Sequence, residues 1–158
     1  VKELSKTAIE LFGDSKLPLS THICNNFLWM FYYFRMKAEF YHLYGLMKDK
    51  NIKYGEPDIT TYSIMIVSIP DFQTNYYEAN ELFDEYFAYV ERYESEIDEY
   101  NWEPVLKSFL AYDGRELLRE KSKGNLIQKQ FQRVCQYAKN SKVILDVQKK
   151  FHFDLVDG

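Results

Sequence analysis

The stretch Pro57-Asp58-Ile59-Thr60-Thr61-Tyr62-Ser63-Ile64-Met65-Ile66 decides the fold that this sequence predicts. A proline–aspartate turn comes first, and Thr60 or Thr61 can then cap a helix whose body is apolar. A second helical pattern follows in EANELFDE, residues 78–85, where Leu82 and Phe83 lie on one stripe. Two helices joined by a short link predict a helical hairpin.

The same arrangement occurs once more, earlier in the chain. The opening Cys24-Asn25-Asn26-Phe27-Leu28 is followed by the apolar run Leu43-Tyr44-Gly45-Leu46-Met47, and the equivalent openings at Cys24 and Tyr62 lie 38 residues apart. Two helices within a period of this length are typical of helical-repeat arrays, which build extended binding surfaces. We therefore expect an all-α fold of antiparallel helical hairpins stacked as an α-solenoid.

Apolar spacing and capping residues predict the remaining helices. Ser20 or Thr21 caps the helix over residues 23–34, Pro70 ends the helix that follows Thr61, and Asn101 caps the helix that contains Pro104. No segment alternates with period two strongly enough to predict a strand. The expected helices span residues 2–12, 23–34, 38–50, 60–68, 76–100, 105–110, 126–138 and 142–153.

Composition and charge narrow the possible functions. Apolar residues make up 46% of the 158 residues, and only 6 Gly and 4 Pro are present, which disfavours a turn-rich β fold. The net charge of −4 argues against a generic nucleic-acid binder. The acid is concentrated in residues 78–103, which form either a solvated helix face or a strip that docks another protein.

Motifs for catalysis or metal binding are not found in the sequence. Cys24 and Cys135 are far apart and are expected to be core thiols in a reducing compartment. Glu94 and Asp98 share a helix face, but they are expected to be exposed rather than catalytic. We therefore expect no enzyme activity, no cofactor and no metal site. The apolar runs are too short to span a bilayer, and the start at Val1 indicates a fragment of a longer protein.

The two quoted segments resemble pentatricopeptide repeat proteins. Residues 57–66 resemble the start of that family's first helix, and residues 78–85 resemble its second helix, with a Glu-Ala-x-x-Leu-Phe core. The loop before Pro57 is longer than in that family and Tyr86 replaces the usual Met, an irregularity that resembles the divergent mitochondrial members. We expect residues 1–100 to form pentatricopeptide-like repeats and residues 101–158 to form degenerate hairpins that continue the array.

The resemblance implies which side chains contact RNA, because each repeat of this family presents one base to two or three side chains. Asn25 and Asp58 correspond to a base-reading pair, with a preference for uracil. Ser63 corresponds to the first member of the next pair, and Ile23 and Tyr62 to residues beside a base. Without the resemblance, Asn25 could bond a neighbouring backbone and Asp58 could be a helix cap or turn residue.

Two further groups of side chains have alternative interpretations. The aromatic stripe Phe31-Tyr32-Tyr33-Phe34 is expected to be core between repeats rather than a stacking platform. A basic strip contacts phosphates or is a solvated surface. It comprises Arg115, Arg119, Lys121, Lys123, Lys129 and Arg133.

By the resemblance, the chain is expected to bind single-stranded mRNA or rRNA in the mitochondrial matrix. Its role would be in transcript stability, processing or translation, or as a component associated with the mitoribosome. The alternative is a tetratricopeptide-like scaffold for protein–protein interaction, whose concave face would hold a peptide. The acidic helix over residues 78–100 could separately contact other proteins. The Trp, Leu-Gly and Tyr signature of that family is absent.

Overall fold

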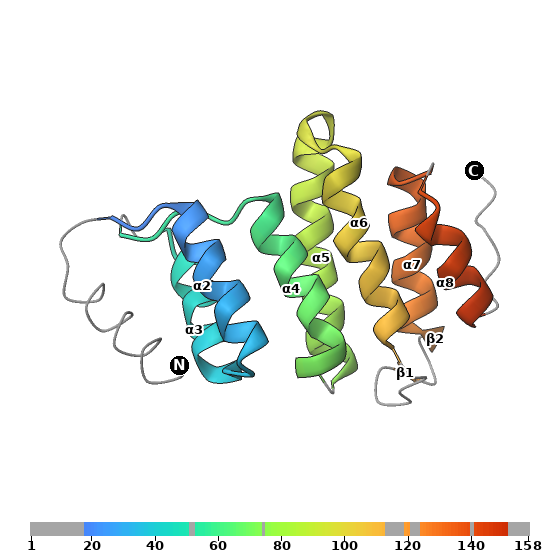
Figure 1. Cartoon of the computed structure of the whole chain (residues 1–158), viewed down its shortest axis with the longest axis horizontal. Helices are drawn as coiled ribbons and strands as arrows, with labels where there is room; N and C mark the ends of the chain where they lie inside the picture. The colour runs from blue at the N-terminus through green and yellow to red at the C-terminus, as the bar shows by residue number, and fades with distance from the viewer. Residues whose placement is uncertain are drawn as a thin grey trace. The chain divides into compact units, whose positions relative to one another are not determined.

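The computed structural model describes residues 18–50, 53–73, 75–112, 119–120, 124–139 and 141–151. These residues are mostly helical, which confirms the all-α class (Figure 1). The expected helix over residues 2–12 lies outside the described residues. The α-helices are α2 (Thr21–Tyr33), α3 (Lys37–Lys48), α4 (Ile59–Phe72), α5 (Tyr76–Tyr93), α6 (Glu99–Ser108), α7 (Leu126–Tyr137) and α8 (Val143–Phe151).

Three shorter elements complete the described chain. Single 3-10 turns follow α5 at Glu94–Glu96 and α6 at Phe109–Ala111. Before α7, β1 (Arg119–Glu120) pairs antiparallel with β2 (Gly124–Asn125). A pairing of two residues is too short to produce an alternating pattern, so periodicity could not predict these strands.

The chain divides into two compact units, Val1–Ile64 and Met65–Gly158. The boundary expected at residue 100 concerns the type of repeat and not the division into compact units. It stays a prediction. Among the described residues, no helix combines the length and the apolar character needed to cross a membrane.

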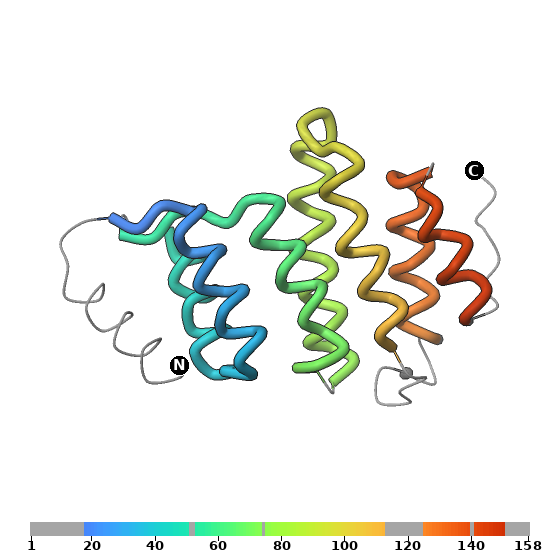
Figure 2. The backbone as a smooth tube through the Cα atoms, viewed as in Figure 1, coloured from blue at the N-terminus to red at the C-terminus, as the bar shows by residue number. Residues whose placement is uncertain are grey.

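In the first unit, α2 and α3 form an antiparallel hairpin (Figure 2). Ser20 caps α2 as expected, because its hydroxyl accepts a hydrogen bond from the Ile23 N–H at 3.2 Å. The chain reverses at Arg35, whose φ of 57° is left-handed. The rings of Phe31 and Phe40 are fully buried in this unit's core.

The loop before α4 pairs with the chain before α2. The Leu19 N–H donates to the Lys53 carbonyl at 2.6 Å, and the Gly55 N–H donates to the Leu19 carbonyl at 2.8 Å. A Cβ atom at position 55 would lie 2.2 Å from the Thr21 backbone nitrogen, so only glycine allows this approach. The pairing brings the start of α4 beside α2.

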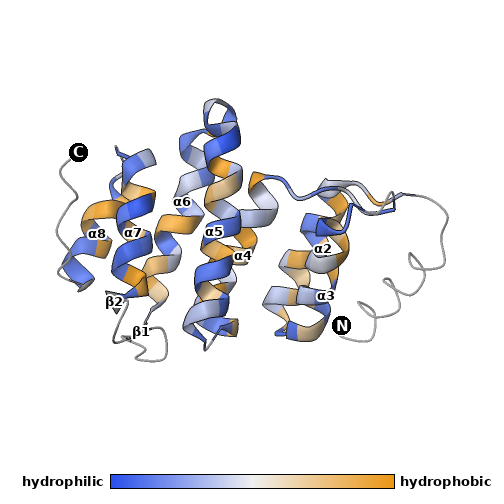
Figure 3. Ribbon diagram, turned by 180° about the vertical axis from the view of Figure 1, so that it is seen from behind, coloured by the Kyte–Doolittle hydropathy of each residue, from blue (hydrophilic) through white to orange (hydrophobic). Residues whose placement is uncertain are grey.

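In the second unit, α5 packs against α7, and α6 packs against α7 and α8. Hydrophilic and hydrophobic positions alternate along α5 and α7 in Figure 3, as expected for helices with one buried side. Stacked and edge-on aromatic rings fill the core: Phe83 lies 6.1 Å from Phe109, and Phe109 lies 5.6 Å from Phe131, between ring centroids.

Two expected helix boundaries were wrong. Helix α4 continues through Pro70 to Phe72, because Pro70 removes only one backbone donor and Gln73 N–H still bonds the Ile69 carbonyl at 3.0 Å. The helix expected over residues 76–100 is interrupted after Tyr93, and α6 begins at Glu99.

Asp98 causes this interruption. Its carboxylate accepts from the Tyr100 N–H at 3.0 Å, and the Asn101 side-chain oxygen accepts from the Asp98 N–H at 3.1 Å. These bonds form a capping box, so the N-cap of α6 is Asp98 and not Asn101.

Candidate functional site

The side chains of Asn25, Asp58 and Thr61 form a closed hydrogen-bonded ring in the first unit. The Asn25 Nδ2 donates to Asp58 Oδ1 at 3.0 Å. The Thr61 hydroxyl donates to Asn25 Oδ1 at 2.6 Å, and the Thr61 N–H donates to Asp58 Oδ1 at 3.0 Å. The Asp58 N–H closes the arrangement by donating to Thr61 Oγ1 at 3.1 Å.

A helix cap and a pairing between distant segments place the members of this ring. Asp58 precedes α4 and accepts from the N–H three residues later, which is the geometry of a helix N-cap. Asn25 lies in the second turn of α2, and the Leu19–Tyr54 pairing brings that helix to the start of α4. Asn25 is 4% exposed and Thr61 is fully buried, so their polar groups need these partners.

The ring leaves one atom free for a ligand. Within the described residues, each hydrogen bond that reaches the Asp58 carboxylate ends on Oδ1, so Oδ2 has no protein partner there. Asp58 is half-buried, unlike Asn25. An ionised carboxylate oxygen only accepts hydrogen bonds, so this position can select an N–H or O–H donor.

The other residues assigned to base contact have different surroundings. Ser63 is 6% exposed, and its hydroxyl donates to the Ile59 carbonyl of its own helix at 2.7 Å. The Tyr62 ring stands edge-on to Tyr44, with 6.3 Å between centroids. Ile23 is 39% exposed on α2. The structure thus brings Asn25 and Asp58 together, while the roles expected for Ser63, Tyr62 and Ile23 stay predictions.

Thr61 is the member of the ring whose role at the site the sequence analysis missed. The expectation that Thr60 or Thr61 caps this helix was wrong, because Asp58 is the cap and Thr61 lies in the first turn of α4. The contact of Thr61 with Asn25 requires the loop pairing at Gly55, which no local pattern shows. A signal was present in the spacing of Asp58 and Thr61, because a polar residue three positions after a helix cap can return a hydrogen bond to it.

The basic strip is only partly described. Arg115, Lys121 and Lys123 lie outside the described residues, and Arg119 belongs to β1. Lys129 is exposed on α7. The role of this strip in phosphate contact stays a prediction.

Arg133, the last member of the basic strip, has partners within the protein. Its Nη1 donates to Asp84 Oδ1 and to Gln130 Oε1, each at 3.0 Å. Its guanidinium carbon lies 4.0 Å from the centroid of the Phe87 ring. Gln130 is fully buried and also donates to Asn80 Oδ1 at 3.0 Å. This network joins α7 to α5, so Arg133 has a structural role.

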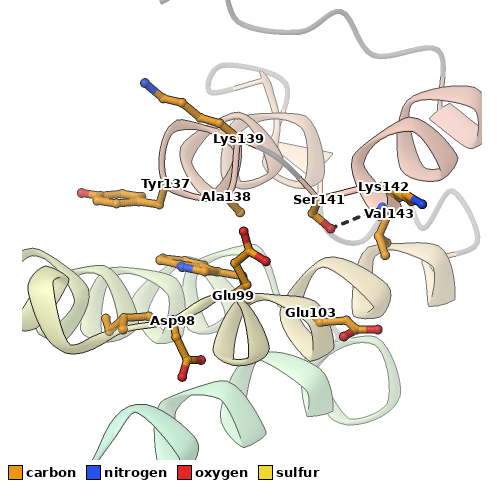
Figure 4. A pocket seen from close by; sticks show the side chains of 11 residues that line it. Asp98, Glu99, Glu103, Tyr137, Ala138, Lys139, Ser141, Lys142 and Val143 are labelled. Atoms are coloured by element: carbon orange, nitrogen blue, oxygen red, sulfur yellow. Dashed lines mark hydrogen bonds between the residues drawn. The ribbon is translucent and has the colours of Figure 1, made fainter.

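A pocket of about 710 Å³ lies between α6 and the turn from α7 to α8. Trp102 and Tyr137 stack within it, with 5.4 Å between centroids and 11° between planes. In Figure 4 the Glu99 side chain extends toward Ala138. The other lining residues include Asp98, Glu103, Lys139, Ser141 and Lys142.

No group of three or more His, Cys, Asp or Glu side chains in the described ranges is placed to hold a metal ion. No protein-family model, curated protein or solved structure matches this chain.

Proposed function

We propose that this chain is a segment of a helical-repeat protein that binds single-stranded RNA in the mitochondrial matrix. It would act in the stability, processing or translation of transcripts, either on mRNA or together with the mitoribosome. The main support is the hydrogen bond between Asn25 and Asp58, which are 33 residues apart in sequence. The resemblance to pentatricopeptide proteins assigns these same two residues to one base.

The order of the helices also supports a repeat array. Helices α2, α4, α6 and α8 begin at Thr21, Ile59, Glu99 and Val143, so alternate helices recur about every 40 residues, a period found in helical-repeat proteins. Stacking of these hairpins as a solenoid is part of the proposal.

The free oxygen of Asp58 gives the proposal a chemical basis for selecting a base. In uracil the central position of the Watson–Crick edge is an imino N–H donor, which a carboxylate oxygen accepts. In cytosine and adenine the equivalent nitrogen is an acceptor and would be repelled by Oδ2. Guanine also has an imino N–H, and the choice of uracil over guanine rests on the family resemblance.

Salt-dependent binding of a ten-nucleotide oligo-U tests this function. Binding is expected to weaken as salt rises, because phosphate contacts release counterions. Asp58→Ala is expected to weaken it about tenfold, as for the loss of one base contact. Asn26→Ala is the matched control, because Asn26 is the exposed neighbour of Asn25. Equal affinities of the wild type and Asp58→Ala would exclude base reading at this position.

Protein docking is the second candidate function, and the pocket beside Trp102 favours it. Glu99 is exposed on one wall, where it could pair with a lysine or arginine of a partner. A lysine-rich peptide that binds the wild type but not Glu99→Gln, in a protein that binds no oligonucleotide, would support this candidate instead.

A further inference from the structure

The end of α2 has a cluster of large aromatic rings that the hairpin core does not bury. Tyr33 is 69% exposed and Phe34 is 45% exposed, whereas the adjacent Phe31 is fully buried. The stripe over residues 31–34 is therefore not uniform core, because Phe31 is buried, Tyr32 is half-buried beside Phe40, and Tyr33 and Phe34 are exposed. Such a group of exposed rings is a common mark of a binding surface.

The exposed rings are ordered by contacts with each other. Trp29 and Tyr33 are one helical turn apart, and their rings stack with 5.7 Å between centroids and 21° between planes. Tyr32 lies 5.5 Å from Tyr33 and 6.1 Å from Trp29. We call Trp29, Tyr32, Tyr33 and Phe34 the turn cluster. Because the rings of Trp29, Tyr32 and Tyr33 hold each other in place, little entropy is lost when a flat ligand stacks on this group.

Positive charge lies next to the turn cluster. Arg35 and Lys37 are exposed, and the guanidinium carbon of Arg35 is 5.8 Å from the centroid of the Tyr32 ring. Glu39 is the only acidic residue among residues 29–41. In a chain with a net charge of −4, this turn combines exposed aromatic rings with a local excess of cations. That combination is complementary to a ligand with flat rings and negative charges.

We propose that the turn cluster is a stacking site for single-stranded RNA, in which a base lies on Tyr33 or Phe34 and Arg35 and Lys37 contact phosphates. The proposal rests on the function proposed above and adds a second contact point to it. Every base has a π face, so stacking here adds affinity without sequence preference. The turn cluster would thus strengthen binding, and Asp58 would select the base.

Substitution of Tyr33 tests this site. Tyr33→Ala is expected to weaken binding of ten-nucleotide oligo-U and oligo-C about tenfold each, leaving the ratio of the two affinities unchanged. Tyr33→Phe keeps the ring and is expected to bind like the wild type. Tyr100→Ala is the matched control, because Tyr100 is 82% exposed on α6, away from the turn cluster in sequence. Tyr33 and Tyr100 are both exposed, so neither change should unfold the protein.

The intrinsic fluorescence of Trp29 gives a second readout. Trp29 and Trp102 are the only 2 tryptophans, so Trp102→Phe leaves Trp29 as the sole reporter. Quenching of this signal by oligo-U supports stacking at the turn cluster. If Tyr33→Ala binds RNA as tightly as the wild type, the stacking site is wrong and the RNA-binding function stands. If the wild type binds neither oligonucleotide, both proposals are wrong.

Discussion

The Asn25 amide and the Asp58 carboxylate, from two helices separated in sequence, share a hydrogen bond of 3.0 Å. Asn25 is nearly inaccessible, and one of its two Nδ2 N–H groups and its Oδ1 acceptor already bond within the protein. The pair therefore stabilises the first unit before any ligand is considered. Of the two side chains, Asp58 is the accessible one and keeps Oδ2 available, so the proposed function assigns base selection to Asp58 and support to Asn25.

Thr61→Val should destabilise the protein. Valine has the same shape as threonine, but it can neither donate to Asn25 Oδ1 nor accept from the Asp58 N–H. Leaving a buried amide oxygen without its donor costs about 1–3 kcal/mol in the free energy of unfolding. Thr60→Val is the control, because Thr60 is the exposed neighbour. Urea unfolding measures the difference, and equal midpoints for the two variants would show that the ring contributes nothing to stability.

The same substitution at two glycines should have opposite effects. Gly55→Ala forces a Cβ atom to within 2.2 Å of the Thr21 nitrogen, and overpacking of this kind costs about 1–3 kcal/mol. Gly45→Ala lies within α3, where a Cβ atom meets nothing within 4 Å, and should stabilise the helix by about 0.5–1 kcal/mol. Thermal unfolding followed by circular dichroism separates these results. A stable Gly55→Ala would contradict the close pairing of the loop with α2.

Arg133→Ala should destabilise the second unit more than Lys129→Ala, the matched change on the same helix. Removal of the guanidinium leaves Oε1 of the fully buried Gln130 without its donor. The expected cost is about 1–3 kcal/mol. The ion pair with Asp84 adds little, because that side chain is 58% exposed. Urea midpoints that do not differ would indicate that Arg133 is free to act as a surface cation.

Stability should fall at alkaline pH because of the buried thiols. Burial raises the pKa of Cys135 from 9.0 to about 11, and burial also raises that of Cys24. The unfolded state loses these protons first, so stability is retained below about pH 9 and declines as the pH rises toward 11. Burial raises the pKa of Tyr86 as well. Its hydroxyl therefore also loses its proton first in the unfolded state, so the stability continues to fall at higher pH.

Urea unfolding at several pH values, with Cys135→Ala as the comparison, measures this effect. The variant should lose less stability than the wild type between pH 9 and 11. Identical pH profiles would indicate that the thiol at Cys135 is not protected in the folded state.

Much of the fold could be predicted because its signals are local. Ser20 precedes an apolar run and caps α2, and the pattern over residues 126–138 matches α7 to within one residue. The interruption before Asp98 was missed because the acidic residues from Glu91 to Glu99 are compatible with one continuous helix. The capping box there uses Asn101 rather than the more common Glu or Gln, so its signal was weak.

The candidate site was harder to predict, because it depends on contacts between distant segments. The family resemblance named Asn25 and Asp58, but the burial of Asn25 and the part played by Thr61 follow from the pairing of Leu19 with Tyr54. The rings of Tyr33 and Phe34 were expected in the core but are exposed. The apolar character of these residues does not show that they lie at the end of α2, where the helical hairpin leaves them uncovered.

Asp58→Asn tests the central claim most directly, because it changes one atom at the position proposed to select the base. The amide oxygen can replace Oδ1 in the ring with Asn25 and Thr61, while an NH₂ donor replaces Oδ2. The measurement is the ratio of oligo-U to oligo-C affinity at one salt concentration. The account predicts that the wild type prefers oligo-U and that the preference shifts about tenfold or more toward oligo-C in the variant. An unchanged ratio, with the fold intact by circular dichroism, would contradict it.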